Sequence, residues 1–335
     1  MKILKHVLSL SLVLSIVLTN CLCVFSIEDD EITAPSAILM DPYSGKVLYE
    51  KNAHDIRACA SITKIMTLLL VMEAIDSGKI SMSDMISASE HAASMGGSDI
   101  WLEKGEVMSV DDLIKATVVA SANDAAVALA EAVAGSESDF VNQMNNKAKE
   151  LSMNDTVFKN CNGLDEDGHL TSAYDVAIMS KELIKHEQIF KYTSIWMDYL
   201  RGGKTQIVNT NKLIKSYKGI TGLKTGTTNE AGSCISATAK RDGLDLIAVV
   251  LGSKTGKDRF KDAQILLDYG FANYMVTKLS LPEDMLMPVK VSNGMDEFVQ
   301  TEVSIDGKFL VPKGKDKEIK TIVDVDESVE APVYE

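Results

Sequence analysis

The sequence predicts an α/β fold of the α+β kind, with one sheet built from strands at both ends of a large domain and helices in between. Residues 36–40 and 46–50 are short strand-like segments around a Pro/Gly turn, which predicts a β-hairpin near the start of the chain. Helical patterns fill most of residues 61–185, and alternating apolar and polar residues return after Trp196. The 335 residues are enough to bury one large core or two modest ones.

Serine and glycine residues mark the ends of several expected helices. Ser109, Ser136 and Ser172 each precede acidic residues, a combination typical of a capped helix N-terminus. Gly78 ends the apolar helix that begins at Ser61. The expected helices cover residues 61–77, 109–121, 124–134, 136–151, 172–185 and 259–275. The later strands are expected over residues 205–209, 222–227, 233–240 and 244–252, with short strands and loops over residues 79–108.

The composition changes again from Pro282, where short strand-like segments alternate with Gly and Lys turns. Strands are expected over residues 289–291, 298–303 and 319–325. We therefore divide the chain into residues 1–26 as a signal peptide, 27–280 as the catalytic domain and 281–335 as a β-rich domain. About fifty residues are few for a stable β-sandwich, so this last domain is expected to be incomplete.

The N-terminus has the pattern of an export signal. Lys2 and Lys5 supply positive charge, residues 7–18 are mainly apolar, and Ser26 offers a small residue for cleavage. An uncleaved anchor helix is the alternative, because the apolar run to Phe25 is long. No later stretch has transmembrane length, so we expect an extracytoplasmic protein, either secreted or at the outer face of the membrane.

Charge and cysteine content exclude several classes of function. The formal net charge of −14 argues against a nucleic-acid surface and against a purely electrostatic grip on anionic lipid. Beyond the signal, Cys59, Cys161 and Cys234 form neither a disulfide framework nor a zinc pattern, so free buried thiols are expected. The histidines show no paired metal-ligand spacing. We expect neither a metal nor another cofactor.

Ser61 and Lys64 stand three residues apart at the start of the apolar helix. This spacing places both side chains on one helix face, with Cβ atoms about 5–6 Å apart. A serine hydroxyl needs a neighbouring base before it can act as a nucleophile, and a buried lysine amine with a lowered pKa can serve as one. The alternative is structural, with Ser61 capping the helix and Lys64 extending to water.

Two further motifs follow in order and give the serine and lysine chemical partners. Ser121-x-Asn123 lies in a break between two helices, and Lys224-Thr225-Gly226 lies on a strand that continues into a hairpin. Ser-x-x-Lys, Ser-x-Asn and Lys-Thr-Gly together are typical of penicillin-binding proteins and class A β-lactamases, in which serine is the nucleophile. Their joint presence favours catalysis over the structural interpretation of Ser61.

The sequence around these motifs resembles the D-alanyl-D-alanine carboxypeptidase family, the low-molecular-mass penicillin-binding proteins. The similarity spans roughly residues 34–274. The matching segments are Ala60-Ser61-Ile62-Thr63-Lys64, Ser121-Ala122-Asn123-Asp124, Asn162-Gly163-Leu164-Asp165, Gly168-His169-Leu170-Thr171-Ser172-Ala173-Tyr174-Asp175 and Gly222-Leu223-Lys224-Thr225-Gly226-Thr227. The resemblance implies a β-lactamase/transpeptidase-like domain with a central antiparallel sheet beside a cluster of helices.

The resemblance also implies how the substrate bond would be cut. Ser61 would attack the carbonyl between two terminal D-alanines of a peptidoglycan stem peptide, with Lys64 as its base. Ser121 would relay a proton to the leaving amine, and Asn123 would hold Lys64 or the substrate amide. β-Lactams would mimic the dipeptide and acylate Ser61.

The third motif would bind the substrate in such an enzyme. Lys224 and Thr225 would hold the terminal carboxylate, next to Gly226. The backbone N–H groups of Thr227 and Ser61 would form the oxyanion hole. The family's second domain usually ends in an amphipathic membrane-anchoring helix, and none is visible here, which leaves membrane association open.

Two departures from the family pattern stand out. Cys59 occupies a position where proline is common, and residues 209–211 lack an arginine that some relatives use for the carboxylate. Two other functions stay open: a class A-like β-lactamase, for which Glu166 would be the deacylating residue, and a non-catalytic penicillin-binding sensor. A His169/Asp175 pair of the serine-protease kind has no Gly-x-Ser-x-Gly motif beside it and is set aside.

Overall fold

The computed structural model describes residues 26–28, 30–278, 287–300, 307–320, 322, 324 and 326–331. The expected signal peptide therefore lies outside the described residues, apart from Ser26. The described chain forms two compact units, one covering Ser26–Phe271 and the other beginning at Ala272. Each unit is taken by itself below.

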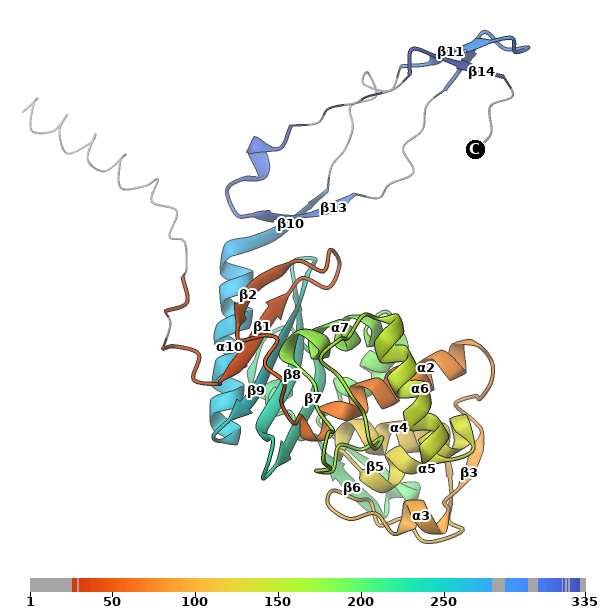
Figure 1. Ribbon diagram of the computed structural model, residues 1–335, viewed down its shortest axis with the longest axis vertical. Helices are drawn as coiled ribbons and strands as arrows, with labels where there is room; N and C mark the ends of the chain where they lie inside the picture. The colour runs from red at the N-terminus through yellow and green to blue at the C-terminus, as the bar shows by residue number, and fades with distance from the viewer. Residues whose placement is uncertain are drawn as a thin grey trace, which may run out of the picture. The chain divides into compact units, whose positions relative to one another are not determined.

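A five-stranded antiparallel sheet is the centre of the larger unit (Figure 1). Its strand order is β2-β1-β9-β8-β7. The strands are β1 (Ser36–Met40), β2 (Val47–Lys51), β7 (Ile220–Thr228), β8 (Gly232–Arg241) and β9 (Leu244–Ser253). Strand β1 pairs with β9, so the sheet joins the first and last strands of the unit. The predicted sheet built from both ends is confirmed.

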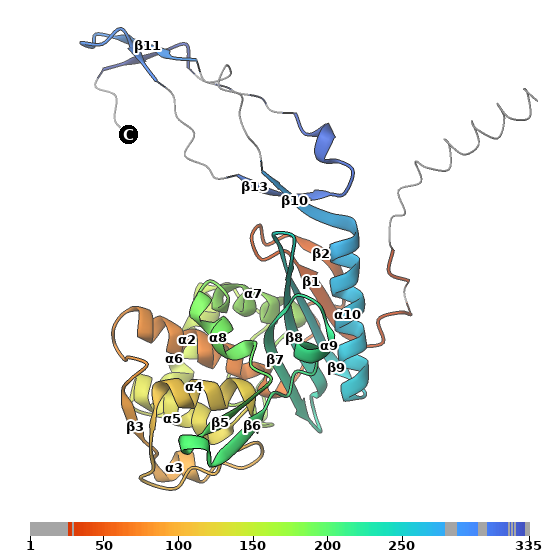
Figure 2. The ribbon, with the colours of Figure 1, turned by 180° about the vertical axis from the view of Figure 1, so that it is seen from behind.

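Helices cover both faces of this sheet (Figures 1 and 2). Helix α10 (Gly256–Asn273) packs on one face so closely that a Cβ at Gly270 would lie 2.5 Å from the side chain of Leu246. On the other face lies the predicted helical cluster, in which α7 contacts β1 and β9. Its members are α2 (Lys64–Asp76), α4 (Val110–Val119), α5 (Asn123–Ala134), α6 (Glu137–Glu150) and α7 (Ala173–Leu183).

Helix α2 is the buried centre of the helical cluster. It contacts α5, α6 and α7, and nearly all of its residues from Lys64 to Ala74 are buried. The long apolar run predicted this, because a helix that is hydrophobic all round must be covered on every side. A lysine at its first position is therefore taken away from water.

Three of the predicted helix caps are present. The hydroxyls of Ser109, Ser136 and Ser172 accept the N–H of the residue three positions later, at 3.1, 3.1 and 3.2 Å. Each bond satisfies a backbone donor that has no partner within its helix.

The structural alternative, in which the Ser61 hydroxyl caps a helix, is wrong. Ser61 lies inside a 3₁₀ turn, η1 (Ala60–Thr63), whose N-cap residue Cys59 makes no side-chain capping bond. Lys64 then begins α2 directly from this turn. The 3₁₀ geometry turns the Ser61 hydroxyl toward Lys64 instead of toward free N–H groups.

Several short elements of three or four residues complete the larger unit. They are β3 (Met85–Ser87), α3 (Glu90–Ala93), β4 (Val107–Ser109), β5 (Met197–Leu200), β6 (Thr205–Val208), η2 (Glu187–Ile189), α8 (Phe190–Thr193), η3 (Arg201–Gly203) and α9 (Leu213–Ser216). Of these, β6 and the short strands between residues 79 and 108 were expected. Segments of three or four residues are too short for periodicity to separate helix from strand.

The second unit is β-rich where the structure describes it. Strand β10 (Tyr274–Lys278) pairs with β13 (Lys308–Pro312), which is followed by the 3₁₀ turn η5 (Asp316–Glu318). Strand β11 (Val289–Ser292) pairs with β12 (Phe298–Val299) and with β14 (Ser328–Glu330). The expected strands over 298–303 and 319–325 fall partly outside the described residues. Among the described helices, none has the length and apolar character to cross a membrane.

Candidate active site

The 3₁₀ turn that carries Ser61 lies against strand β7. A Cβ at Gly226 would lie 2.8 Å from the carbonyl oxygen of Cys59 and 2.9 Å from the nitrogen of Ser61. Only glycine leaves room for this approach of two backbones. Ala60, just before Ser61, has φ +51°, in the left-handed region that β-carbon-bearing residues rarely occupy. The Lys-Thr-Gly glycine thus fixes how close β7 comes to the serine.

Lys64 is completely buried at the start of α2 and holds three polar contacts with its amine. Its Nζ lies 3.0 Å from Ser61 Oγ, 2.5 Å from Asn123 Oδ1 and 2.6 Å from the carbonyl oxygen of Asn162. Burial lowers the pKa of Lys64 to about 7. A neutral amine has two N–H groups for the two carbonyl oxygens, and its lone pair then faces the Ser61 hydroxyl.

Asn123 is the first residue of α5, and its orientation is fixed from the opposite side. Its Nδ2 donates to the carbonyl of Gly96 at 2.6 Å, and its backbone N–H donates to Ser98 at 2.6 Å. The neighbouring Asp124 accepts the N–H groups of Ile100 and Leu102. This loop holds Asn123 Oδ1 toward Lys64.

Ser121 and Lys224 form a second buried pair across the site. Lys224 Nζ donates to Ser121 Oγ at 2.8 Å and to the carbonyl of Thr225 at 2.9 Å. Burial, together with the positive charges of Lys64 and Arg259, holds the pKa of Lys224 well below its usual range. Ser121 reaches this position with φ +62° in the break between α4 and α5. The structure therefore brings all three motifs together in the larger unit.

A loop at Asn162 supplies a contact that the sequence did not single out. Its backbone carbonyl is an acceptor for Lys64, and Asn162 itself was noted only as part of a family segment. A backbone carbonyl has no signature in the residue type, so no side-chain motif could have revealed it. Next to it, Gly163 has φ +85°, and a Cβ there would lie 2.0 Å from the carbonyl oxygen of Ala60.

Replacement of Gly163 by alanine is expected to displace the Asn162 carbonyl and to destabilise the fold. The new methyl group meets backbone, which cannot move aside as a side chain can, and a left-handed alanine costs about 1–3 kcal/mol besides. We expect a lower Tm and slower acylation by penicillin. Gly168→Ala is the matched control, because its φ is also positive while its Cβ would meet only the flexible end of Lys159. Equal losses in both variants would contradict this account.

Arg259 in α10 is a buried cation. The sequence predicted only that it begins a helix and indicated no function for it. Its Nη1 donates to the carbonyl of Gly226 at 2.8 Å and to Thr227 Oγ1 at 2.7 Å. Residues 209–211 carry no arginine, and there Thr210 bonds Thr225 through their hydroxyls at 2.6 Å. A guanidinium thus reaches the Lys-Thr-Gly strand from another element.

His169 supports the serine turn and does not pair with Asp175. Lys159 N–H donates to His169 Nδ1 at 3.0 Å, so the other ring nitrogen carries the proton and donates to Thr63 Oγ1 at 2.7 Å. Thr63 in turn donates to the carbonyl of Ala60 at 2.9 Å. Burial lowers the pKa of His169 to about 4, which keeps the ring neutral. The Asp175 carboxylate accepts instead from the Thr156 hydroxyl and the Asp155 N–H.

The sequence matches a known family over most of the larger unit. The sequence model of Peptidase_S11, described as D-alanyl-D-alanine carboxypeptidase, matches residues 23–255. The chain belongs to the D-alanyl-D-alanine carboxypeptidase family. The family and the enzyme class predicted from the motifs, a serine-type D-alanyl-D-alanine carboxypeptidase, are confirmed.

Named members of the carboxypeptidase family align with nearly the whole chain. The D-alanyl-D-alanine carboxypeptidase DacF of Bacillus subtilis is 45% identical, over 98% of this chain and 87% of its own length. Penicillin-binding protein 5 of Haemophilus influenzae has a solved structure with a TM-score of 0.81 and 32% identity, covering 92% of this chain and 91% of that one. The predicted transpeptidase-like fold is confirmed by this likeness.

A further solved relative contains an antibiotic. Penicillin-binding protein D2 of Listeria monocytogenes, in its ampicillin-bound form, has 34% identity and a TM-score of 0.67 over 73% of this chain and all of its own.

Cys59, Cys161 and Cys234 are free and buried, as predicted. Within the described ranges, no group of three or more His, Cys, Asp or Glu side chains could hold a metal ion.

Proposed function

We propose that this carboxypeptidase removes the terminal D-alanine from peptidoglycan stem peptides by acyl transfer through Ser61. One observation carries the proposal: Lys64 Nζ lies 3.0 Å from Ser61 Oγ while two carbonyl oxygens occupy its other donor directions. This geometry suits a neutral amine that takes the serine proton. A pKa of about 7 leaves a large fraction of Lys64 in that form near neutral pH.

In the first step, Ser61 Oγ forms a bond to the carbonyl carbon between the two D-alanines, and its proton passes to Lys64. The carbonyl oxygen becomes an oxyanion that the N–H groups of Ser61 and Thr227 stabilise. Each donor of this kind is worth about 2.7–4 kcal/mol. The close approach of Gly226 to the Ser61 nitrogen supports this assignment, because it brings β7 alongside the serine backbone.

In the second step, the C–N bond breaks and the leaving amine needs a proton. Lys64 gives up the proton that it took from Ser61, and Ser121 relays it to the amine, which leaves Lys64 neutral again. The hydrogen bond from Lys224 to the Ser121 hydroxyl supports that role. Asn123 keeps Lys64 in place during both transfers. D-Alanine leaves, and water then hydrolyses the ester on Ser61 with Lys64 as its base.

Strand β7 binds the terminal carboxylate of the substrate in this proposal. Lys224 contributes charge, and Thr225 and Thr227 contribute hydroxyls along β7. We add Arg259 to this set because its guanidinium contacts Thr227 Oγ1 directly. A buried guanidinium offers the planar donor arrangement that a carboxylate prefers.

The loop beside Lys64 favours carboxypeptidase over β-lactamase chemistry. Glu166, the residue that a β-lactamase would need, is exposed, and its carboxylate accepts from Asn160 Nδ2 at 3.0 Å. The group of this loop that contacts Lys64 is the uncharged carbonyl of Asn162. We therefore expect penicillin to acylate Ser61 and to leave slowly. The N-terminal pattern expected to be an export signal supports a reaction outside the cytoplasm.

The test is a comparison of two reactions of the purified protein. One measures D-alanine released from a peptide ending in D-alanyl-D-alanine. The other measures the penicilloyl adduct on the protein by intact mass and the rate at which penicillin is hydrolysed. Release of D-alanine together with a long-lived penicilloyl adduct supports the proposal. Rapid penicillin hydrolysis without an adduct would instead indicate a β-lactamase, and an adduct without D-alanine release would indicate a sensor.

A further inference from the structure

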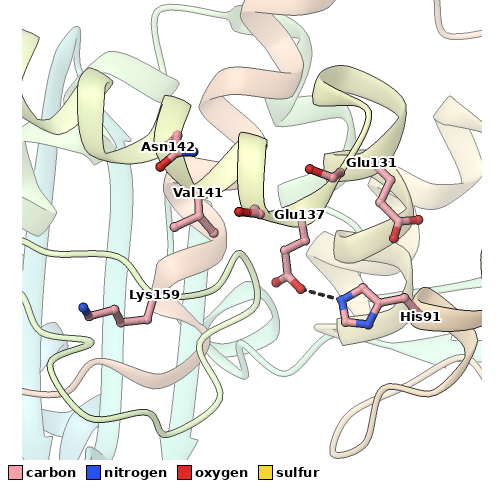
Figure 3. Close-up of a pocket in the computed structure, with 8 residues that line it drawn as sticks. His91, Glu131, Glu137, Val141, Asn142 and Lys159 are labelled. Carbon is pink, nitrogen blue, oxygen red and sulfur yellow. Dashed lines mark hydrogen bonds and ion pairs between the residues drawn. The ribbon is translucent and has the colours of Figure 1, made fainter.

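A pocket opens beside the start of α6. Its volume is ≈ 450 Å³, and Figure 3 shows the residues that line it as sticks. The lining residues are His91, Glu131, Ser136, Glu137, Ser138, Val141, Asn142 and Lys159. Glu137, the first residue of α6, lines this pocket and also contacts the loop at Cys161, because its two carboxylate oxygens have different partners.

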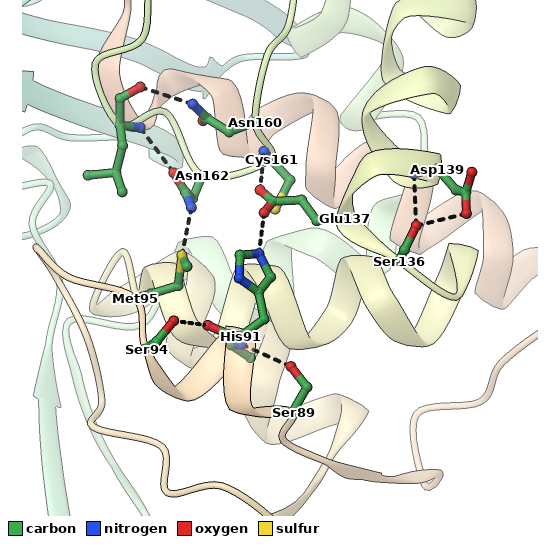
Figure 4. A network of polar contacts seen from close by, with 12 residues as sticks. Ser89, His91, Ser94, Met95, Ser136, Glu137, Asp139, Asn160, Cys161 and Asn162 are labelled. Atoms are coloured by element: carbon green, nitrogen blue, oxygen red, sulfur yellow. Dashed lines mark hydrogen bonds and ion pairs between the residues drawn. The ribbon is translucent and has the colours of Figure 1, made fainter.

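The two partners of Glu137 are drawn in Figure 4. One oxygen accepts from His91 Nε2 at 2.7 Å, and the other accepts the backbone N–H of Cys161 at 3.0 Å. Although burial acts to raise it, these two donors hold the pKa of Glu137 below its usual range. The carboxylate is therefore ionised and makes a charge-assisted bond to a buried backbone group.

Cys161 is held at both of its backbone polar groups. Its N–H is bonded to Glu137, and its carbonyl accepts from Thr67 Oγ1 at 2.5 Å on α2. Its side chain is fully buried. The next carbonyl in the chain is that of Asn162, which lies 2.6 Å from Lys64 Nζ. The residue that Glu137 contacts is thus the direct neighbour in sequence of the residue whose carbonyl orients Lys64.

We propose that Glu137 is a positioning residue for the acyl-transfer reaction, acting through the Cys161–Asn162 backbone on the orientation of the Lys64 amine. If the Cys161 N–H loses its acceptor, the buried donor must find water or another partner, and the Asn162 carbonyl moves with it. Lys64 then loses one of the two acceptors that direct its lone pair at Ser61. Displacements of about 1 Å in catalytic groups can cost on the order of 10²-fold in rate.

Neighbouring contacts hold the rest of the loop but do not replace Glu137. Asn160 Oδ1 accepts from Gly163 N at 2.7 Å, and Asn162 Oδ1 accepts from Leu164 N at 3.0 Å. Asn162 Nδ2 reaches the Met95 sulfur at 3.5 Å. These bonds shape the turn after Asn162, whereas the bond from Cys161 to Glu137 anchors the turn to α6.

The test separates the length of the side chain from its charge. Glu137→Gln keeps an acceptor at the same reach, Glu137→Asp keeps the charge but is one methylene shorter, and Glu137→Ala removes both. Glu131→Ala is the matched control, because Glu131 lines the same pocket. Acylation by a fluorescent penicillin is followed at increasing concentration, which yields the binding constant of the first complex and the acylation rate constant at saturation.

We expect Glu137→Ala and Glu137→Asp to lower the saturating acylation rate constant by about 10- to 100-fold, because the base is misplaced. The binding constant should stay as in the wild type, since none of these atoms belongs to the carboxylate site. Glu137→Gln and Glu131→Ala should acylate at close to the wild-type rate. Each rate is divided by the concentration of active sites, which is titrated with penicillin, so that unfolded protein in a variant does not lower the measured rate constant.

Three outcomes would overturn the proposal: an unchanged rate constant in Glu137→Asp, a weakened binding constant instead of a slower rate, or an equal loss in Glu131→Ala. If Glu137→Ala fails to fold, the other two variants still decide, because Glu137→Gln must have a higher acylation rate constant than Glu137→Asp. The inference rests on acyl transfer at Ser61, which the wild-type adduct tests separately. Absence of that adduct would refute the proposed function. If the wild type forms the adduct and all variants acylate at the wild-type rate, only the role of Glu137 is refuted.

Discussion

The Ser61→Ala variant is expected to release no measurable D-alanine and to form no penicilloyl adduct. Removing a serine nucleophile lowers kcat on the order of 10⁶-fold in a comparable serine hydrolase, because no other group can form the ester. The fold should persist, since the lost hydroxyl contacts only Lys64 and, at 3.5 Å, the Asn162 carbonyl. Long incubations with substrate and intact mass after penicillin treatment measure both effects.

A matched control keeps this result specific. Ser94→Ala removes an exposed hydroxyl on the edge of α3 and should leave both reactions unchanged. If Ser61→Ala still carried a penicilloyl group, another residue would be the nucleophile and the assignment of Ser61 would fail. A lowered Tm with a full adduct would lead to the same conclusion.

Replacing Lys64 by glutamine is expected to lower the acylation rate by about 10²–10⁴-fold, the usual worth of a general base. The wild-type rate should rise with pH and level off above a midpoint of about 7, where burial places the pKa of Lys64. Below this midpoint the amine holds a proton and cannot accept the one from Ser61. Acylation rates across a pH series measure the midpoint in the wild type and its loss in the variant.

The control for Lys64 is Lys149→Gln, which removes an exposed lysine near the end of α6 and should keep the wild-type rate and midpoint. A rise centred near pH 10 would mean that Lys64 titrates like a free lysine. The base would then be another group. A pH-independent rate would lead to the same revision.

Side-chain chemistry made much of the site predictable from the sequence. Ser61, Lys64, Ser121, Asn123 and Lys224 could be named because they stand in three short motifs typical of one enzyme class. The structure brings them within hydrogen-bonding distance in pairs. The helix caps were also predictable, since a serine before acidic residues is a local signal. The central sheet followed from long alternating strands.

The parts of the site that the sequence did not predict are contacts made by the backbone or by residues far apart in the chain. The Asn162 carbonyl has no residue-type signature, and Glu137 looks like an ordinary acid in a first helical turn until Cys161 is seen beside it. Arg259 reaches β7 only because α10 packs near that strand. The 3₁₀ turn at Ser61 was missed because an apolar run predicts helix without specifying how its first turn begins.

The pairing of β1 with β9 has a consequence for the order in which the protein can fold. Ser36 lies opposite Leu251, so the hairpin made first during synthesis must wait for almost the whole unit before its partner exists. Contacts so far apart in the chain slow folding, because a long loop must close before they contribute stability. Until then, the buried faces of β1 and α2 are exposed to aggregation or proteolysis. Catalytic competence therefore arises late, when the final strands close the sheet beside Ser61.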